Sequence, residues 1–304
     1  MATRGRKSTP KKTPVKSVDE LRERSSVPEK PIATQGKEKS KIKVLFFLPD
    51  DASLSEMHLD EISKKIPSTK QADPLCLVIH SDGGNPFAAV KIMRLLKSIF
   101  GSVIALLPEK AYSAGALMTL GADELYMSVN ACLGPLDLPM EHPQDGTLIS
   151  ALDVINASTT IATFVDEIAA KRFSDLRTNK KIRSRTEAAK IAYQSATESV
   201  LPILSKIDPY LTQKSYRELK IAWWYAYDLL IAGLMKNTPH LAWNTSKTLT
   251  TSFPAHEYAI FRDEAKKMLK LPVQGLENFS DWSLIKPDFD ILRSAGIEIT
   301  YKEL

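Results

Sequence analysis

Apolar and polar residues along residues 43–140 follow two periods, one typical of strands and one typical of helices. Short apolar runs that end at proline, aspartate or glycine predict buried strands over 43–50, 74–80 and 102–108. Between these runs, apolar positions at helical spacing predict helices over 53–66 and 86–100. Because strands and helices alternate, we expect βαβ units and a mostly parallel sheet with flanking helices.

The second half of the chain has a different pattern. Long helical periods cover 149–173, 186–207 and 215–236, with a polar, basic break over 174–185. A further helix is predicted over 257–271, and a short helix followed by a strand over 288–304. The fold class is therefore α/β with a helical second half.

The first 40 residues differ from the rest in composition. They hold 11 Lys/Arg and 5 Asp/Glu, which gives this segment a net charge of +6. Because the whole chain has a net charge of +5, residues 41–304 carry about −1. We expect 1–40 to be a disordered basic tail and 41–304 to be the folded domain. The folded domain lacks the basic excess of a nucleic-acid groove, so any contact with nucleic acid is expected only through the tail.

Composition narrows the class of protein further. No apolar run approaches the ~20 residues of a membrane span, and the N-terminal segment lacks the apolar centre of a secretory signal. We expect a cytoplasmic protein, with an organelle transit peptide left open. Cys76 and Cys132 lie in apolar runs, and no Cys/His cluster has the spacing of a metal site, so neither metal nor cofactor is expected.

A lone serine, Ser113, stands between Ala-Tyr and Ala-Gly-Ala just before an apolar helical run. A strand-to-helix turn there would expose the hydroxyl and supply helix N–H groups without intrahelical partners, which nucleophilic catalysis requires. The alternative is that Ser113 only caps the helix.

Paired glycines, Gly83 and Gly84, follow the predicted strand 74–80. Glycine permits positive φ, so this turn could direct backbone N–H groups into a cleft at the carboxyl edge of the sheet. The alternative is a plain turn.

Five motifs in this order resemble the serine dehydrogenase proteinase family of the Clp protease/crotonase superfold, relatives of signal peptide peptidase A. The resemblance covers roughly residues 42–273. The motifs are His80-Ser81-Asp82-Gly83-Gly84, Ala111-Tyr112-Ser113-Ala114-Gly115-Ala116, Ala122-Asp123-Glu124-Leu125, Leu133-Gly134-Pro135-Leu136-Asp137-Leu138 and Ala255-His256-Glu257-Tyr258-Ala259-Ile260.

This resemblance implies a serine peptidase-like hydrolase that cleaves peptide bonds through an acyl-enzyme. It implies Ser113 as the nucleophile and Gly83, Gly84 and the N–H of Ala114 as oxyanion-hole donors. It also implies a peptide or protein substrate, assembly into homo-oligomers, and no metal or nucleotide.

The chain departs from the family pattern at Asp82, where proline is usual, and at Ala116, where threonine is usual. The strand that carries the Clp histidine has none here. Three candidates for the general base stay open: His142, His256, and Lys171 in a serine–lysine dyad that would require a buried lysine.

Two other functions stay open beside the peptidase. One is a catalytically inactive scaffold or binding protein, which the departures favour. The other is acyl-CoA chemistry of the crotonase type, which a serine at the turn disfavours.

Overall fold

The computed structural model describes residues 41–49, 53–137, 139–142, 146–178 and 184–304. Residues Lys41–Leu304 form one compact unit. The predicted disordered tail, 1–40, lies outside the described residues, so its disorder stays a prediction.

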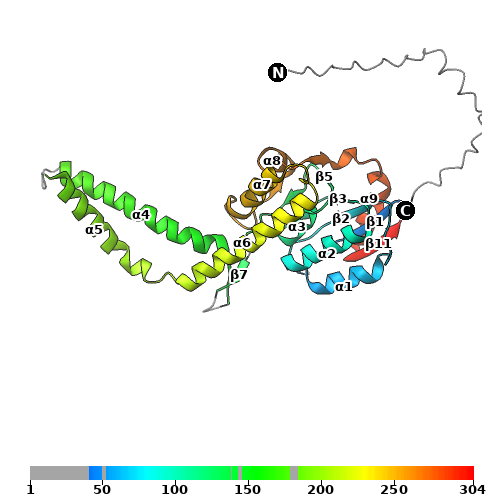
Figure 1. Cartoon of the computed structure of the whole chain (residues 1–304), viewed down its shortest axis with the longest axis horizontal. Helices are drawn as coiled ribbons and strands as arrows, with labels where there is room; N and C mark the ends of the chain where they lie inside the picture. Colours follow the sequence, from blue (N-terminus) through cyan, green and yellow to red (C-terminus); the bar gives the residue numbers. More distant parts are fainter. Residues whose placement is uncertain (1–40, 50–52, 138, 143–145, 179–183) are drawn as a thin grey trace, which may run out of the picture. The chain divides into compact units, whose positions relative to one another are not determined.

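A six-stranded sheet forms the centre of this unit, with the strand order β10-β5-β3-β2-β1-β11 (Figure 1). All neighbouring strands are parallel except β1 and β11, which are antiparallel. The mostly parallel α/β sheet is therefore confirmed. Its strands are β1 (Lys43–Phe47), β2 (Leu75–Ile79), β3 (Val103–Leu107), β5 (Glu124–Met127), β10 (Val273–Gly275) and β11 (Ile299–Glu303).

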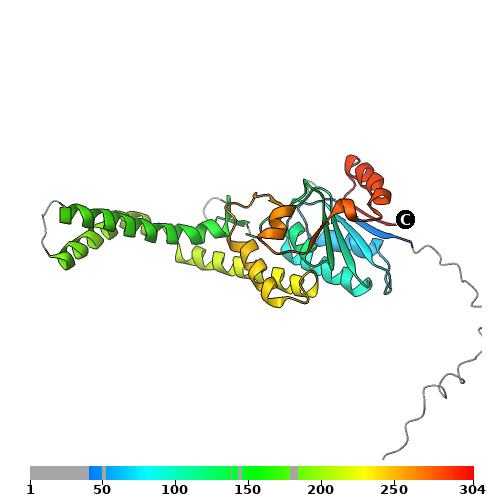
Figure 2. The same ribbon diagram turned by 90° about the horizontal axis from the view of Figure 1, so that it is seen from above.

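Both faces of the sheet are covered by apolar side chains because residues along each strand alternate between faces. Leu45 and Phe47 of β1 belong to the larger core cluster, which they share with α1 (Glu56–Lys65), α2 (Pro86–Ile99) and α3 (Ala114–Leu120). Val44 and Phe46 belong to a second cluster with α9 (Trp282–Ser294). Figure 2 shows α9, in red, on the opposite face from α1 and α2.

Four helices follow the parallel units, and the helical pattern of the sequence predicted the first three of them. They are α4 (Ala151–Thr178), α5 (Arg185–Leu204), α6 (Pro209–Ala232) and α7 (Pro239–Thr251). α4 packs against α5 and α6, and α6 packs against α7 and α3. α4 continues to Thr178, beyond the break predicted at 174, and α7 was not predicted.

Two small sheets were also not predicted. The first has the order β4-β6-β9, from β4 (Lys110–Ala111), β6 (Cys132–Leu133) and β9 (Ile260–Phe261). The second pairs β7 (Pro139–Glu141) with β8 (Leu148–Ser150).

The helix predicted over 257–271 is wrong in its first part. Residues Ile260–Phe261 are strand, and α8 covers only Arg262–Lys267. The reason is tertiary: Ile260 pairs with Leu133 of β6, and the Phe261 N–H donates to Glu264 Oε2 at 3.0 Å, which starts the helix one residue later.

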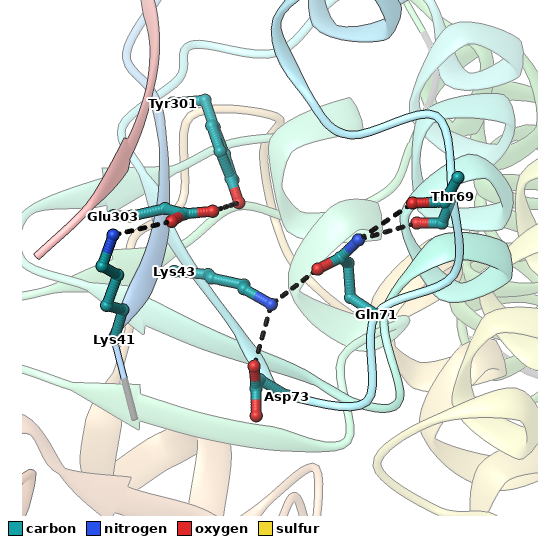
Figure 3. Close-up of polar contacts among 7 residues, drawn as sticks. All are labelled: Lys41, Lys43, Thr69, Gln71, Asp73, Tyr301 and Glu303. Atoms are coloured by element: carbon teal, nitrogen blue, oxygen red, sulfur yellow. Dashed lines mark hydrogen bonds and ion pairs between the residues drawn. The ribbon is translucent and has the colours of Figure 1, made fainter. Parts of the chain in front are cut away.

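A buried lysine stabilises the amino edge of the sheet. Lys43, at the start of β1, is 7% exposed, and its Nζ donates to Gln71 Oε1 at 2.7 Å and to Asp73 Oδ2 at 2.8 Å (Figure 3). Burial and the neighbouring Glu303 raise the pKa of Tyr301 to about 12. These polar groups lie at the opposite edge from Ser113, which follows the carboxyl end of β3, so we assign them a structural role.

Candidate active site

Ser113 has an unusual backbone conformation. Its φ is 47° and its ψ is −113°, and it immediately precedes α3. A non-glycine residue in this region costs about 1–3 kcal/mol, and such residues cluster at functional sites. The side chain makes no capping hydrogen bond, although Ser113 occupies the cap position. The geometry is therefore that of a sharp strand-to-helix turn without the capping bond of the alternative reading.

Glycines surround this turn closely. A Cβ on Gly83 would lie 2.8 Å from Ser113 Cβ, and a Cβ on Gly134 would lie 3.1 Å from Ser113 N. Because these neighbours approach so closely, Ser113 is only 4% exposed. The sequence predicted an exposed serine, whereas Ser113 as a whole residue is buried in the structure.

The glycine pair lies beside the serine turn, as the sequence predicted. The segment 81–85 pairs with a residue on each side. Gly84 forms a parallel β-bridge with Leu54, and Ser81 forms one with Ala111. Gly83 and Gly84 have φ values of 106° and 134°, which favour glycine.

The two glycine N–H groups point in different directions. The Gly83 N–H donates to Ser81 Oγ at 3.1 Å. The Gly83 carbonyl accepts from Leu54 N at 2.7 Å, and in a trans peptide the N–H points opposite to the carbonyl. The Gly84 N–H therefore points away from Leu54, toward the side on which Ser113 lies.

The third expected donor, the N–H of Ala114, belongs to the first residue of α3, where no intrahelical acceptor exists. A Cβ on Gly83 would lie 3.4 Å from this nitrogen. The Ala114 nitrogen therefore lies beside the glycine turn.

Asp82 does not place an uncompensated charge beside these donors. Its side chain is about half exposed, and Lys110 Nζ lies 2.8 Å from its carboxylate. The departure from the family's proline is thus accommodated at the surface by an ion pair.

A buried carboxylate and a histidine form the second part of the site. His256 Nδ1 lies 3.0 Å from Asp137 Oδ1, and Ser150 Oγ donates to Asp137 Oδ2 at 2.9 Å. Asp137 is 3% exposed. The hydrogen bond with Asp137 is the main cause that raises the pKa of His256 above its usual 6.5, against the opposing effect of burial. Both residues line a cavity of about 710 Å³.

The small sheet β4-β6-β9 brings these residues to one end. β4 and β6 are parallel, and β6 and β9 are antiparallel. Ser113 follows β4, Asp137 follows β6, and His256 precedes β9. All three therefore leave the sheet at the same end.

Asp137 was missed as a site residue, although it closes the Leu-Gly-Pro-Leu-Asp motif. Asp137 and His256 are 119 residues apart in the sequence, so no local sequence pattern predicts their contact.

The other two predicted bases, His142 and Lys171, do not line the Asp137–His256 cavity. His142 follows β7, and its backbone N–H donates to the Thr147 carbonyl at 2.8 Å in the turn toward β8. Lys171 is exposed on α4, about 25 Å along the helix from Val154, which lines the Asp137 cavity. Lys171 thus lacks the burial that a serine–lysine dyad requires.

The comparison with protein families covers the segment that holds Ser113 and Asp137 and ends before His256. Residues 53–190 match the family model of ClpP-like SDH-type serine proteinases. Two uncharacterized proteins of Methanocaldococcus jannaschii are similar: MJ0137 is 30% identical over 36% of this chain and 38% of its own length, and MJ1495 is 37% identical over 26% and 27%. The chain thus spans well under half the length of these curated relatives.

Two solved structures of the 1510-N membrane-bound stomatin-specific protease, both mutants and one in complex with a substrate peptide, are also similar. They share 19% and 18% identity, cover 50% of this chain and 66% and 69% of theirs, and each has a TM-score of 0.29. The similarity to the ClpP-like SDH-type serine proteinases covers residues 53–190 of this chain.

Proposed function

We propose that this protein is a serine peptidase that cleaves peptide bonds through an acyl-enzyme on Ser113. The observation that supports the proposal is topological: the strained Ser113 turn and the segments that carry Asp137 and His256 lie at the same end of the small sheet. In serine peptidases, a histidine and a buried carboxylate together activate the serine hydroxyl for attack.

In this reaction His256 is the general base. Asp137 accepts from His256 Nδ1–H, which leaves Nε2 as the nitrogen that takes the Ser113 proton. Asp137 also stabilises the imidazolium that forms. His256 then returns the proton to the leaving amine, and a water molecule activated by the same Nε2 hydrolyses the ester.

The oxyanion that forms on the substrate carbonyl would accept from the Gly84 and Ala114 N–H groups. Gly83 has a different part in this proposal, since its N–H donates to Ser81 Oγ. Its missing side chain instead lets the turn approach Ser113. Donors fixed before the reaction need no reorganisation when the charge develops.

A fluorophosphonate probe tests this assignment. We expect the wild type to be labelled and Ser113→Ala to be unlabelled. His256→Gln should slow labelling by about 10²-fold or more, since it removes the base. His142→Gln is the matched control and should label at the wild-type rate.

Failure to label the wild type would contradict the peptidase and favour the scaffold. Slow labelling of His142→Gln with normal labelling of His256→Gln would transfer the role of base to His142.

The remaining features of the proposal concern the whole protein. We propose a peptide or protein substrate, a homo-oligomer and a cytoplasmic location, without metal or cofactor. Among the described residues, no helix combines the length and apolarity needed to cross a membrane. The near-neutral charge of residues 41–304 supports the absence of a nucleic-acid groove, with the basic tail as the one exception.

A further inference from the structure

A second cavity of about 790 Å³ lies between α4, α6 and α7. Buried Ile155 and Leu219 and the partly buried Leu152 and Trp223 line it. Figure 2 shows the start of α4 beside α6, the two helices that supply these residues. This volume falls within the range of sites that bind ligands.

The rim of this groove is cationic. Arg217 and Lys220 lie three residues apart and therefore share one face of α6, and Lys247 comes from α7. All three are exposed, and within the part of the chain that the structure describes no carboxylate forms an ion pair with any of them. Among the described residues that line the groove, none is acidic.

The groove adjoins the cavity of the Asp137–His256 pair. Leu152 lines both cavities. The neighbouring cavity is more acidic, since Asp153 and Glu257 line it beside the Asp137–His256 pair. A polypeptide that extends from one cavity into the other would therefore meet a change from acidic to basic walls.

We propose that the groove between α4, α6 and α7 binds an acidic, amphipathic segment of the polypeptide substrate. Its apolar side chains contact Leu152, Ile155 and Leu219, and its carboxylates contact the three rim cations. This inference rests on the proposed function and adds a substrate class to it. The basic tail of this chain does not fit as the occupant, because its charge has the same sign as the rim.

Nucleic acid is the competing occupant, because the cationic groove also has two aromatic side chains, Tyr216 and Trp223, in its lining. The observations favour a peptide, because aliphatic side chains line the groove and the groove adjoins the Asp137–His256 cavity. Backbone binding of single strands instead uses a continuous basic track with stacked aromatic rings.

Fluorescence anisotropy tests the proposal on the Ser113→Ala protein, which cannot cleave its ligand. The probe is a fluorescein-labelled dodecapeptide that repeats Leu-Glu-Ser-Glu, and two comparison peptides carry Gln or Lys in place of Glu. We expect the Glu peptide to bind at least about tenfold more tightly than either, with affinity that falls as salt rises.

Charge reversal locates the binding site. In the Ser113→Ala background, the double variant Arg217→Glu/Lys220→Glu should weaken binding of the Glu peptide by about tenfold or more. The control, Lys190→Glu/Lys236→Glu, changes the net charge equally at exposed positions outside the groove, and it should change affinity less than about twofold.

Two binding results would overturn the proposal: equal weakening by both double variants, or equal binding of the Glu and Gln peptides. Tighter binding of a single-stranded oligonucleotide through Arg217 and Lys220 would also overturn it. So would equal cleavage of all three peptides by the wild-type protein, which retains Ser113. Groove-dependent binding without cleavage by the wild type would refute the peptidase and leave the groove assignment intact. The two proposals can therefore fail separately.

Discussion

Ser113 and Gly83 depend on each other at the residue scale. Ser113 adopts its positive φ where Gly83 leaves room for it, and Gly83 itself has a φ of 106°. A side chain at position 83 would contact the serine that the proposed chemistry requires. The strained turn therefore depends on a residue 30 positions earlier in the chain.

Gly83→Ala tests this dependence. The new methyl group would combine backbone strain with a contact at 2.8 Å from Ser113 Cβ, so we expect a loss of about 2–4 kcal/mol of unfolding free energy and the loss of probe labelling. Gly296→Ala is the control, because Gly296 has a φ of 65° but no atom within 4 Å of a Cβ. It should cost about 1 kcal/mol and leave labelling unchanged. Urea unfolding and the labelling rate measure both effects, and equal losses in the two variants would contradict the prediction.

The aromatic residues of α6 and α7 join these two helices at the element scale. The Trp243 ring centroid lies 4.3 Å from that of Trp223, 5.6 Å from that of Trp224 and 5.5 Å from that of Tyr227. Such ring pairs contribute about 0.5–1.5 kcal/mol each beyond the area that they bury. The cluster thus holds in place the two helices that form the cationic rim.

Trp243→Ala should therefore destabilise the protein by about 2–4 kcal/mol, and Trp243→Phe by less than half as much because one ring remains. Urea unfolding followed by circular dichroism measures both values. If the two variants unfold at the same urea concentration as the wild type, the aromatic cluster does not hold α6 and α7 together.

The elements that sequence predicted well are those with a strong local period. Sequence predicted five elements within a few residues: the strands β1, β2 and β3 and the helices α1 and α2. Each of them has its full pattern, an apolar run or helical spacing, within one short segment. The two-residue strands β4, β6 and β9 are too short to show a period, so the sheet that gathers the candidate site was not predicted. Ser113 and Gly84 were recognised from local motifs, whereas the partnership of Asp137 with His256 depends on the pairing of β6 with β9.

At the scale of the whole molecule, one proton links activity and stability. The pKa of His256 is raised in the folded protein above its usual 6.5. A raised pKa means that protonated His256 stabilises the fold below that usual value, and this contribution is lost as pH rises through the folded pKa. The proposed reaction requires neutral His256, so activity rises over the same pH range in which this stabilisation declines.

Asp137→Asn tests this link. The variant removes the charge that raises the pKa of His256, so the acid limb of kcat/KM should move to lower pH and kcat should fall by about 10²-fold or more. The change in Tm across this pH range should become smaller. Thermal unfolding and peptide hydrolysis between about pH 5 and about pH 9 measure both. An acid limb unchanged from the wild type would exclude His256 as the titrating base.

The order of the small sheet also has a consequence during synthesis. Its third strand, β9, is made after α4, α5, α6 and α7, although it pairs with a strand made before them. Under the proposed chemistry, a nascent chain that ends before Ile260 holds the nucleophile without a docked base. The proposed nucleophile and its base are therefore brought to one end of the small sheet only after β9 has been translated and has paired with β6.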